Sequence, residues 1–495
     1  MAGERTTEQA VGFCTAVGRP CRRTPGNPGF VGNRLQNALS RQAIHLVQQG
    51  VVTPEDLDTV VTHSPKPATA SNPPPCPPWK TPAATSTPRR TEMTATTTPL
   101  AKLDDQLTAD FYLYEALLSD EERKILLKAR TFLHDEIKPL VNDSWGKGEL
   151  PKEMIDRFRG SGLAALAYEG YGEHLPAISH LLDGMLAAEL GRVDASCATF
   201  FGVHNGLGFY SIYYGGDQEQ RDRWLPAMAS MEKIGAFALT EPLGGSDVSG
   251  GMRTTARREG DTWVLNGAKK WIGNATFADY VVVFARDADD NQVKGFVVEK
   301  GAPGFEPVKI EGKIALRIVQ NAEITLTDVR VPEANRLQNM NGFRDVAEVL
   351  RQTRSGVAWQ ALGVMIGAYE LALDYAKERR QFGRPIAGFQ MVQDLLVKSL
   401  GNITASWGML VQLARLQDQG IFRDEHSALA KEYVAARMRE VVAFSREIFG
   451  GNGILLDYDI ARFFADAEAL YSYEGTHQMQ TLIVGKSITG HSAFV

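Results

Sequence analysis

The sequence predicts an α+β protein with an N-terminal helical domain, a middle β domain and a C-terminal four-helix-bundle domain, preceded by a short helical fragment and a disordered linker. The main evidence is that segments with helical periodicity lie on both sides of a block of short β-type segments. The 495 residues are 44% hydrophobic and 23% charged, with a net charge of −6. These values are typical of a globular chain of two or three domains and give no indication of nucleic-acid binding.

Residues 64–100 predict a disordered linker, because proline, threonine, serine and alanine dominate and little there can form a core. The linker separates a helical head at residues 1–63 from the body of the chain, which starts at residue 101. Within the body we expect a helical domain at 101–233, a β domain at 234–344 and a second helical domain at 345–495.

The first helical block contains EERKILLKARTFLHDEI at residues 121–137, whose apolar residues recur at spacings of three and four. Ser119 precedes two glutamates and is the predicted N-cap of this helix. The second helical block contains three long segments of the same kind, at residues 357–383, 389–417 and 426–451.

Between the helical blocks, four segments are short, rich in β-branched or aromatic residues, and bounded by Asn, Gly and Asp: residues 262–275, 280–286, 294–300 and 322–331. Each predicts a strand. The pair Asn266-Gly267 predicts a hairpin turn, because this dipeptide favours the backbone of a two-residue hairpin loop.

Several common functional motifs are missing from the sequence. No GxGxxG follows a strand, and HExxH and GxSxG do not occur, so neither a Rossmann site, a metal site nor a serine hydrolase is expected. VGKS at 484–487 lacks the first glycine of a P-loop, since Gln480 stands there. The four cysteines form no CxxC, which favours a reducing compartment. No apolar run of membrane-spanning length and no signal-peptide core is expected.

Five motifs carry the functional interpretation: FALTEPLGGSD (237–247), KKWIGN (269–274), ERRQFGRPIAGFQ (378–390), FGGNGI (449–454) and YEGTH (473–477). Each one alone has an ordinary structural meaning, such as a turn, a core Trp, a basic helix end or a helix C-cap. Their order along residues 105–495 resembles the acyl-CoA dehydrogenase and oxidase family, nearest to glutaryl-CoA dehydrogenases and plant-type short-chain acyl-CoA oxidases.

The resemblance implies an FAD-dependent enzyme that uses no Rossmann domain and forms a homo-oligomer, either a dimer or a tetramer. It implies an acyl-CoA substrate, and electron-transfer flavoprotein or oxygen as electron acceptor. The residues that the resemblance assigns to FAD are Phe237, Leu239, Thr240, Ser246, Trp271, Ile272, Gly273, Arg379, Arg380, Gln381, Phe389, Gln390, Glu447, Gly450, Gly451 and Thr476. Those from Arg379 to Gln390 hold the diphosphate and adenosine part of a neighbouring subunit's cofactor. Ser246, Arg354 and Gly475 are assigned to the substrate.

The resemblance also assigns Glu474 as the catalytic base. Removing two hydrogens from a saturated acyl thioester takes a proton from Cα and a hydride from Cβ, and the hydride goes to flavin N5 in this family. The Cα proton is weakly acidic, so the site needs a desolvated carboxylate and donors aimed at the thioester oxygen. In the family the backbone N–H of the base is one of those donors.

The substrate is expected to be a short or medium acyl chain. Glutaryl-CoA dehydrogenases bind the distal carboxylate with an arginine, and Ala198 stands at that position here. Phe200 and Phe201 follow and predict an apolar pocket floor. Gly273 replaces a threonine that contacts flavin N5 in the dehydrogenases, which leaves an acyl-CoA oxidase as an alternative. A catalytically silent acyl-CoA-binding scaffold is the alternative of another class.

Residues 11–63 of the head resemble part of a 3-hydroxyacyl-CoA dehydrogenase C-terminal domain, on the evidence of PGFVGNRL at 28–35. About fifty residues of such a domain cannot bury a normal core, so we expect no activity from the head. The C-terminal HSAFV is not an SKL-type signal, and Glu4 and Glu8 do not suit a presequence. The expected location is therefore open between the mitochondrion and the peroxisome.

Overall fold

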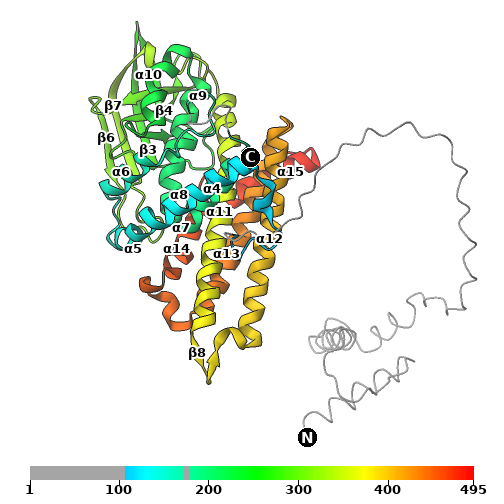
Figure 1. Ribbon diagram of the computed structural model, residues 1–495. Helices are drawn as coiled ribbons and strands as arrows, with labels where there is room; N and C mark the ends of the chain where they lie inside the picture. Colours follow the sequence, from blue (N-terminus) through cyan, green and yellow to red (C-terminus); the bar gives the residue numbers. More distant parts are fainter. Residues whose placement is uncertain (1–105, 172–177, 495) are drawn as a thin grey trace, which may run out of the picture. The chain divides into compact units, whose positions relative to one another are not determined.

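The computed structural model of the protein describes residues 106–171 and 178–494 (Figure 1). The predicted head at 1–63 and the predicted linker at 64–100 lie outside the described residues. All described residues belong to one compact unit of the chain, Thr96–Val495.

The N-terminal part of this unit is helical. Ser119 caps its first long helix, because its hydroxyl accepts the Glu122 N–H at 3.3 Å while the Glu122 carboxylate accepts the Ser119 N–H at 3.1 Å. The predicted N-cap is therefore confirmed. The helices are η1 (Tyr114–Leu117), α4 (Asp120–Phe132), η2 (Leu133–Ile137), α5 (Lys138–Lys147), α6 (Lys152–Ser161), α7 (His180–Val193), α8 (Ala195–Gly202), η3 (Val203–Phe209), α9 (Tyr210–Gly215) and α10 (Gln218–Ala229).

The middle part is a seven-stranded sheet with the order β1-β4-β2-β3-β7-β6, and β5 pairs with β4. The four predicted strands are confirmed as β3, β4, β5 and β7. β1, β2 and β6 lie outside the four predicted segments: β1 has only four residues, and β2 and β6 are short and expose polar side chains. The strands are β1 (Gly235–Ala238), β2 (Thr255–Glu259), β3 (Thr262–Ile272), β4 (Tyr280–Asp287), β5 (Val293–Glu299), β6 (Phe305–Lys309) and β7 (Ala322–Pro332).

The predicted hairpin turn at Asn266-Gly267 is wrong, because β3 runs straight through both residues. The turn lies at Gly260-Asp261, where Glu259 pairs with Thr262 and Gly260 has a φ of 63°. Gly267 has a different purpose: a Cβ there would lie 2.6 Å from the Thr254 Oγ1. The glycine thus permits a close approach within the sheet, beside a register shift.

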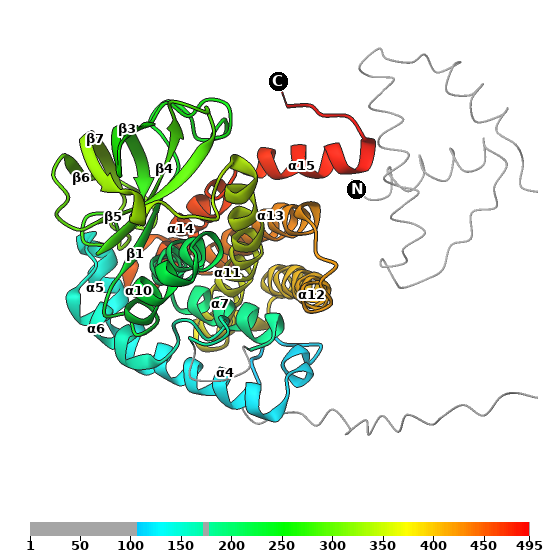
Figure 2. The same cartoon turned by 90° about the horizontal axis from the view of Figure 1, so that it is seen from above.

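The C-terminal part is again helical, which confirms the α+β class. Its helices are α11 (Phe343–Glu378), α12 (Gln390–Asp418), α13 (Asp424–Ile448), α14 (Ile460–Ser472) and α15 (His477–Thr489), with short 3₁₀ turns at Ile386–Gly388, Gly450–Ile454 and Leu456–Tyr458. A small hairpin of β8 (Arg380–Gln381) and β9 (Arg384–Pro385) joins α11 to α12. Seen from above, α11 lies in the middle of the molecule, between α7 and α13 (Figure 2).

Among the described residues, α11 alone is long and apolar enough to cross a membrane by length and composition, with a mean hydropathy of 1.3. The expectation that no segment approaches such a length is therefore wrong. However, 78% of this window is buried inside the protein. A helix that packs on several sides is apolar all round, and this packing explains the composition.

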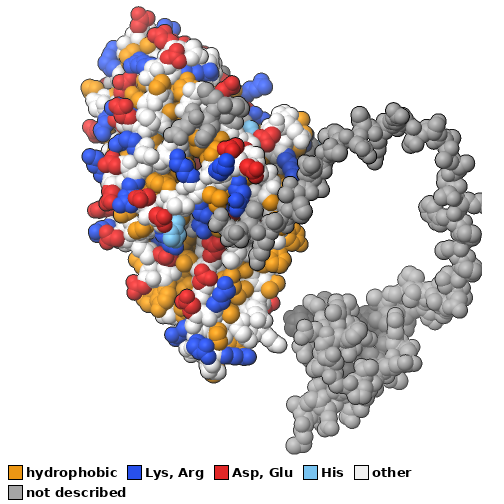
Figure 3. Space-filling view, viewed as in Figure 1, with side chains coloured by type: hydrophobic (Ala, Val, Ile, Leu, Met, Phe, Trp, Pro, Cys, Tyr) orange, Lys and Arg blue, Asp and Glu red, His pale blue; other side chains and the backbone are white. Residues whose placement is uncertain are grey.

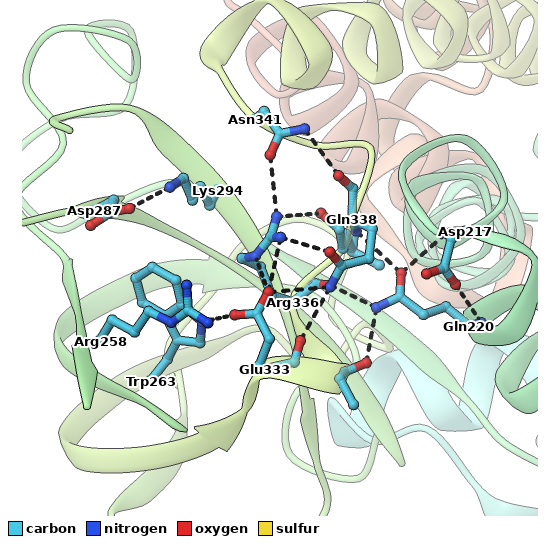
Figure 4. A network of polar contacts seen from close by, with 12 residues as sticks. Asp217, Gln220, Arg258, Trp263, Asp287, Lys294, Glu333, Arg336, Gln338 and Asn341 are labelled. Carbon is cyan, nitrogen blue, oxygen red and sulfur yellow. Dashed lines mark hydrogen bonds and ion pairs between the residues drawn. The ribbon is translucent and has the colours of Figure 1, made fainter. Parts of the chain in front are cut away.

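Polar networks join the three parts of the described unit. Gln220 of α10 donates to the Arg336 carbonyl at 2.6 Å, and Trp263 of β3 donates to the Glu333 carboxylate at 2.5 Å (Figure 4). These contacts hold the segment that leaves the sheet for α11. A second, buried network pairs Arg462 of α14 with Asp194, which precedes α8.

Candidate active site

Glu474 lies in the four-residue loop, residues 473–476, between α14 and α15. Glu474 and Gly475 both have left-handed backbone conformations, with φ values of 51° and 83°. This region is unfavourable for a residue with a Cβ. At Gly475 a Cβ would also lie 2.5 Å from the Gln480 Nε2, so only glycine fits there. The loop ends at Thr476, whose hydroxyl accepts the Met479 N–H and caps α15.

The carbonyl groups of Tyr473, Glu474 and Gly475 accept hydrogen bonds from the side chains of two neighbouring helices. Lys431 of α13 is buried, and its Nζ donates to the carbonyls of Tyr473 and Gly475. Gln480 of α15 donates to the carbonyls of Glu474 at 3.1 Å and Gly475 at 3.0 Å. These bonds hold the loop in its left-handed form.

The Glu474 carboxylate lies among two cations and a hydroxyl. Burial raises the pKa of Glu474 above the usual 4.5. The Thr353 hydroxyl, Lys431 and Arg354 each favour the charged form and offset part of this rise. The Glu474 Oε2 is buried and has no hydrogen-bond partner among the described residues. A desolvated carboxylate with a free oxygen is suited to accept a proton.

The pKa of Lys431 is shifted in the opposite direction from that of Glu474. Burial lowers the pKa of Lys431 to about 7, although Glu474 favours its charged form.

Arg354, which was predicted to bind substrate, lies beside Glu474 but is held in place by the protein. Its guanidinium is largely buried and pairs with Asp424 at the start of α13. Its Nε is buried without a partner among the described residues. Arg354 therefore acts on Glu474 through its charge, and its Nε is available to a ligand.

The TEPLGGSD loop follows β1, and a buried ion pair fixes it. Lys269 of β3 donates to the Leu239 carbonyl at 3.0 Å and to Glu241 Oε1 at 2.9 Å. Burial lowers the pKa of Lys269 to about 8. Burial alone would raise the pKa of Glu241, but Lys269 and the Thr254 hydroxyl hold it below its usual value. Thr240 and Ser246 extend from a loop that is thus fixed at its base.

The residues predicted for FAD in the sheet differ in what they expose. Trp271 is the next-to-last residue of β3, with a φ of 65° and a side chain that is 54% exposed. The side chains of Phe237, Leu239 and Ile272 are buried in the core, so a ligand could reach only their backbone. A Cβ on Gly273 would lie 3.0 Å from Val203, which places this strand end against η3.

The η3 segment connects the two sides of the candidate site. Val203 faces Gly273 of the sheet, and a Cβ on Gly206 would meet the Thr353 methyl at 4.0 Å. Thr353 is the residue whose hydroxyl reaches Glu474. The structure therefore brings the strand end at Trp271–Gly273, Arg354 and the loop at 473–476 to one region.

The other predicted FAD residues lie elsewhere in the same chain. Arg354 is near the start of α11, and Glu378 ends that helix 24 residues later, which is about 36 Å along the helix axis. Figure 1 shows β8 at the opposite end of the helices from α15. Eight of the predicted FAD residues lie at or near that far end, and we call them the far group: Arg379, Arg380, Gln381, Phe389, Gln390, Glu447, Gly450 and Gly451. One chain therefore does not bring the two groups together.

The residues near Glu474 fit a flavin. An exposed Trp271 can lie on a flat ring, and the loop after β1 offers hydroxyls and backbone N–H groups. Two buried polar atoms, Glu474 Oε2 and Arg354 Nε, lack partners among the described residues, as expected where a ligand completes the site. The far group adds the guanidinium groups that a diphosphate requires.

Sequence reasoning missed Lys431, Thr353 and the Glu241–Lys269 pair. Glu241 and Lys269 lie inside motifs that were recognised, and their opposite charges were a usable signal. Lys431 was also detectable, because it lies on the apolar face of α13 among alanines and valine. Phe200 and Phe201 pack against Phe158 in the core, and their role as a pocket floor stays a prediction.

Comparison with known proteins agrees with this geometry. Sequence models of the acyl-CoA dehydrogenase family match three consecutive regions: the N-terminal domain at 119–232, the middle domain at 236–329 and the C-terminal domain at 340–489. The 3-hydroxyacyl-CoA dehydrogenase C-terminal domain model matches residues 29–67, which confirms the resemblance of the head.

Individual proteins are similar over most of the chain. An acyl-CoA dehydrogenase of Bacillus subtilis is 33% identical over 75% of this chain and 99% of its own length. Two structures of glutaryl-CoA dehydrogenase from Mycobacterium smegmatis, one in complex with FADH2, are 37% and 32% identical over 77% of this chain and 97% of theirs, with a TM-score of 0.74. Butyryl-CoA dehydrogenase from Megasphaera elsdenii is 32% identical over 75% of this chain and 98% of its own, with a TM-score of 0.72.

The fold and the site define a flavin-dependent oxidoreductase that acts on acyl-CoA thioesters. The chain belongs to the acyl-CoA dehydrogenase family, whose members depend on FAD.

Proposed function

We propose that the protein dehydrogenates short, straight-chain acyl-CoA thioesters to trans-2-enoyl-CoA, with Glu474 as the base. The observation that carries this proposal is the Oε2 of Glu474, which is buried and has no partner among the described residues. Lys431 holds the backbone of the same loop by a hydrogen bond to the Tyr473 carbonyl. Glu474 takes the Cα proton, and its raised pKa makes it a better acceptor for that proton. Bound FAD supplies the acceptor for the hydride that leaves Cβ.

The residues of this chain orient the reacting groups. Thr240, Ser246 and Trp271 would hold the flavin side of the site, while Thr476 and the far group from Arg379 to Gly451 would hold the rest of FAD. The Glu474 N–H points away from Lys431, because Lys431 binds the carbonyl of the same peptide group, and this N–H can bind the thioester oxygen.

The proposal of a substrate without a distal carboxylate rests on the apolar residue Ala198. Ala198 is fully buried, and its carbonyl accepts a bond from Gln360, the residue that also accepts the Tyr473 hydroxyl. No arginine stands there to pair with a distal carboxylate, and an unpaired buried charge would cost several kcal/mol. Glutaryl-CoA is therefore disfavoured, and the similarity to a butyryl-CoA dehydrogenase supports a short acyl chain.

Gly273 favours a second candidate, an acyl-CoA oxidase. A Cβ at this position would already crowd Val203, so the strand end carries no side chain that could cover the neighbouring ligand. An uncovered flavin edge would admit oxygen, with hydrogen peroxide as the product. The dehydrogenase, with electron-transfer flavoprotein as acceptor, is the leading proposal.

We also propose a homo-oligomer. The far group of FAD residues lies about a helix length from Glu474, so a neighbouring subunit would have to supply it. The hairpin and α12 beside this group expose large apolar side chains, among them Phe382 (94%), Met391 (82%) and Val397 (68%). Hydrophobic atoms are exposed over this part of the molecule in Figure 3.

The test is a substrate series with the full-length holoenzyme. We expect butyryl-CoA and hexanoyl-CoA to bleach the flavin under anaerobic conditions, and glutaryl-CoA to leave it oxidised. Reoxidation is then followed with oxygen and with electron-transfer flavoprotein. Rapid reoxidation in air with release of peroxide would establish the oxidase, while glutaryl-CoA as the best substrate would contradict the assignment based on Ala198.

A further inference from the structure

Lys431 is a buried lysine that the proposed reaction does not use. It lies on α13, its side chain is almost completely inaccessible, and its Nζ contacts the carbonyls on either side of Glu474. Transferring an ammonium group into the interior costs several kcal/mol, so a neutral residue would be the cheaper choice for packing alone. The burial of Lys431 is therefore best explained by a function in the loop at residues 473–476.

The peptide group between Tyr473 and Glu474 provides that reason. In a trans peptide the C=O and the next N–H point in opposite directions. Lys431 binds the Tyr473 carbonyl, so the Glu474 N–H must point away from α13. None of the described residues accepts a hydrogen bond from this N–H. A fixed donor without an acceptor is what an incoming carbonyl oxygen requires.

Gln480 cannot replace Lys431 in this role. Its amide binds the carbonyls of Glu474 and Gly475, which belong to the next two peptide groups. Lys431 alone holds the Tyr473 carbonyl among the described residues. A cationic donor also polarises the peptide it binds, which strengthens the N–H at the other end as a donor.

We propose that Lys431 is a positioning residue: it orients and polarises the peptide group whose Glu474 N–H binds the thioester oxygen of the acyl-CoA substrate. This inference rests on the proposed function and adds to it the residue that holds the oxygen-binding donor in place.

The test compares Lys431→Met with Gln480→Met in the full-length holoenzyme. Both variants remove a donor to the same loop, but only Lys431→Met releases the peptide that carries the Glu474 N–H. The probe is crotonyl-CoA with an isotope-labelled carbonyl, bound to the oxidised enzyme, and the readout is its carbonyl stretching frequency. Hydrogen bonding to the oxygen lowers this frequency relative to the free ligand.

We expect the carbonyl frequency to be lowered, relative to free crotonyl-CoA, in wild type and in Gln480→Met. In Lys431→Met we expect this lowering to be at most half of the wild-type value. We further expect kcat of Lys431→Met to fall about 10²-fold, the effect of a lost oxyanion donor, while KM changes much less. Flavin content and thermal unfolding check that each variant is folded. Lys431→Gln keeps one neutral donor and should give an intermediate frequency, even if the methionine variant does not fold.

A wild-type carbonyl shift in folded Lys431→Met or Lys431→Gln would overturn the positioning role. So would an equal loss of the shift in Gln480→Met, because the effect would then belong to the loop as a whole. If wild type itself bound crotonyl-CoA without any shift and acyl-CoA left the flavin oxidised, the proposed function would fail first. The two failures are therefore distinguishable.

Discussion

At the scale of single residues, Glu474 combines an unfavourable backbone with an unfavourable environment for its charge. A left-handed residue with a Cβ costs about 1–3 kcal/mol. The structure maintains it through hydrogen bonds from Lys431 and Gln480 to the loop carbonyls. Burial raises the pKa of the carboxyl, and two nearby cations limit the rise. The result is a carboxylate that is charged yet poorly solvated.

The pH dependence of turnover should report this balance. Glu474 must be deprotonated to act, so kcat should fall as the pH falls through its pKa, which lies above the usual 4.5. Arg354→Gln removes a cation that favours the carboxylate, so the pKa should rise further and the acidic limb should move to higher pH. The measurement is kcat against pH for both enzymes, with Arg439→Gln as a surface control. A limb that moves to lower pH would contradict the account.

The sequence indicated Glu474 through its motif but could not indicate its partners. YEGT is local, and a short match suffices to recognise it. Lys431 and Thr353 lie on two other helices, 43 and 121 residues earlier in the chain. Their proximity to Glu474 depends on how α11, α13 and α15 pack, and helix periodicity alone does not fix that packing.

At the scale of elements, the sequence was informative where local chemistry decides the structure. Ser119 with Glu122 forms the predicted helix start, and the strands with many β-branched residues were found. β2 and β6 were missed because neither has a continuous apolar pattern. Asn266-Gly267 was misinterpreted because the dipeptide Asn-Gly is also typical of hairpin turns. Here the glycine is needed for close packing against Thr254.

The buried pair of Arg462 and Asp194 joins α14 to the N-terminal helices. Arg462→Met would leave Asp194 buried without its cation, and breaking such a pair costs about 3–5 kcal/mol. Arg439→Met is the matched control, because Arg439 pairs with Glu468 at the surface and such pairs contribute about 0–1 kcal/mol. Chemical denaturation of both variants gives the comparison. Equal losses of stability in Arg462→Met and Arg439→Met would show that burial of the ion pair does not determine the cost of breaking it.

At the scale of the whole molecule, the residues proposed for FAD form two groups that one described chain does not bring together. Arg354 and Glu378 are separated by most of α11. The exposed apolar side chains of the hairpin and α12 lie beside the far group. The sequence indicated this separation in part, because it predicts a long helical segment before Arg379, and α11 itself begins further upstream, at Phe343.

A charge on this surface should disrupt both assembly and cofactor binding. Val397→Asp places a carboxylate on the exposed face of α12, and we expect a lower molar mass in sedimentation and a lower flavin content. Ile314→Asp is the control, since Ile314 is as exposed but lies outside α12. A monomeric wild type that retains its full complement of FAD would contradict the shared site.

The central claim is that Glu474 removes the Cα proton, and anaerobic single-turnover reduction tests it most directly. Wild type and Glu474→Gln are loaded with FAD and mixed with butyryl-CoA, and the visible flavin absorbance is followed. We predict rapid bleaching in wild type and a rate lower by at least about 10³-fold in Glu474→Gln, with flavin still bound. Bleaching of Glu474→Gln at the wild-type rate would contradict the account.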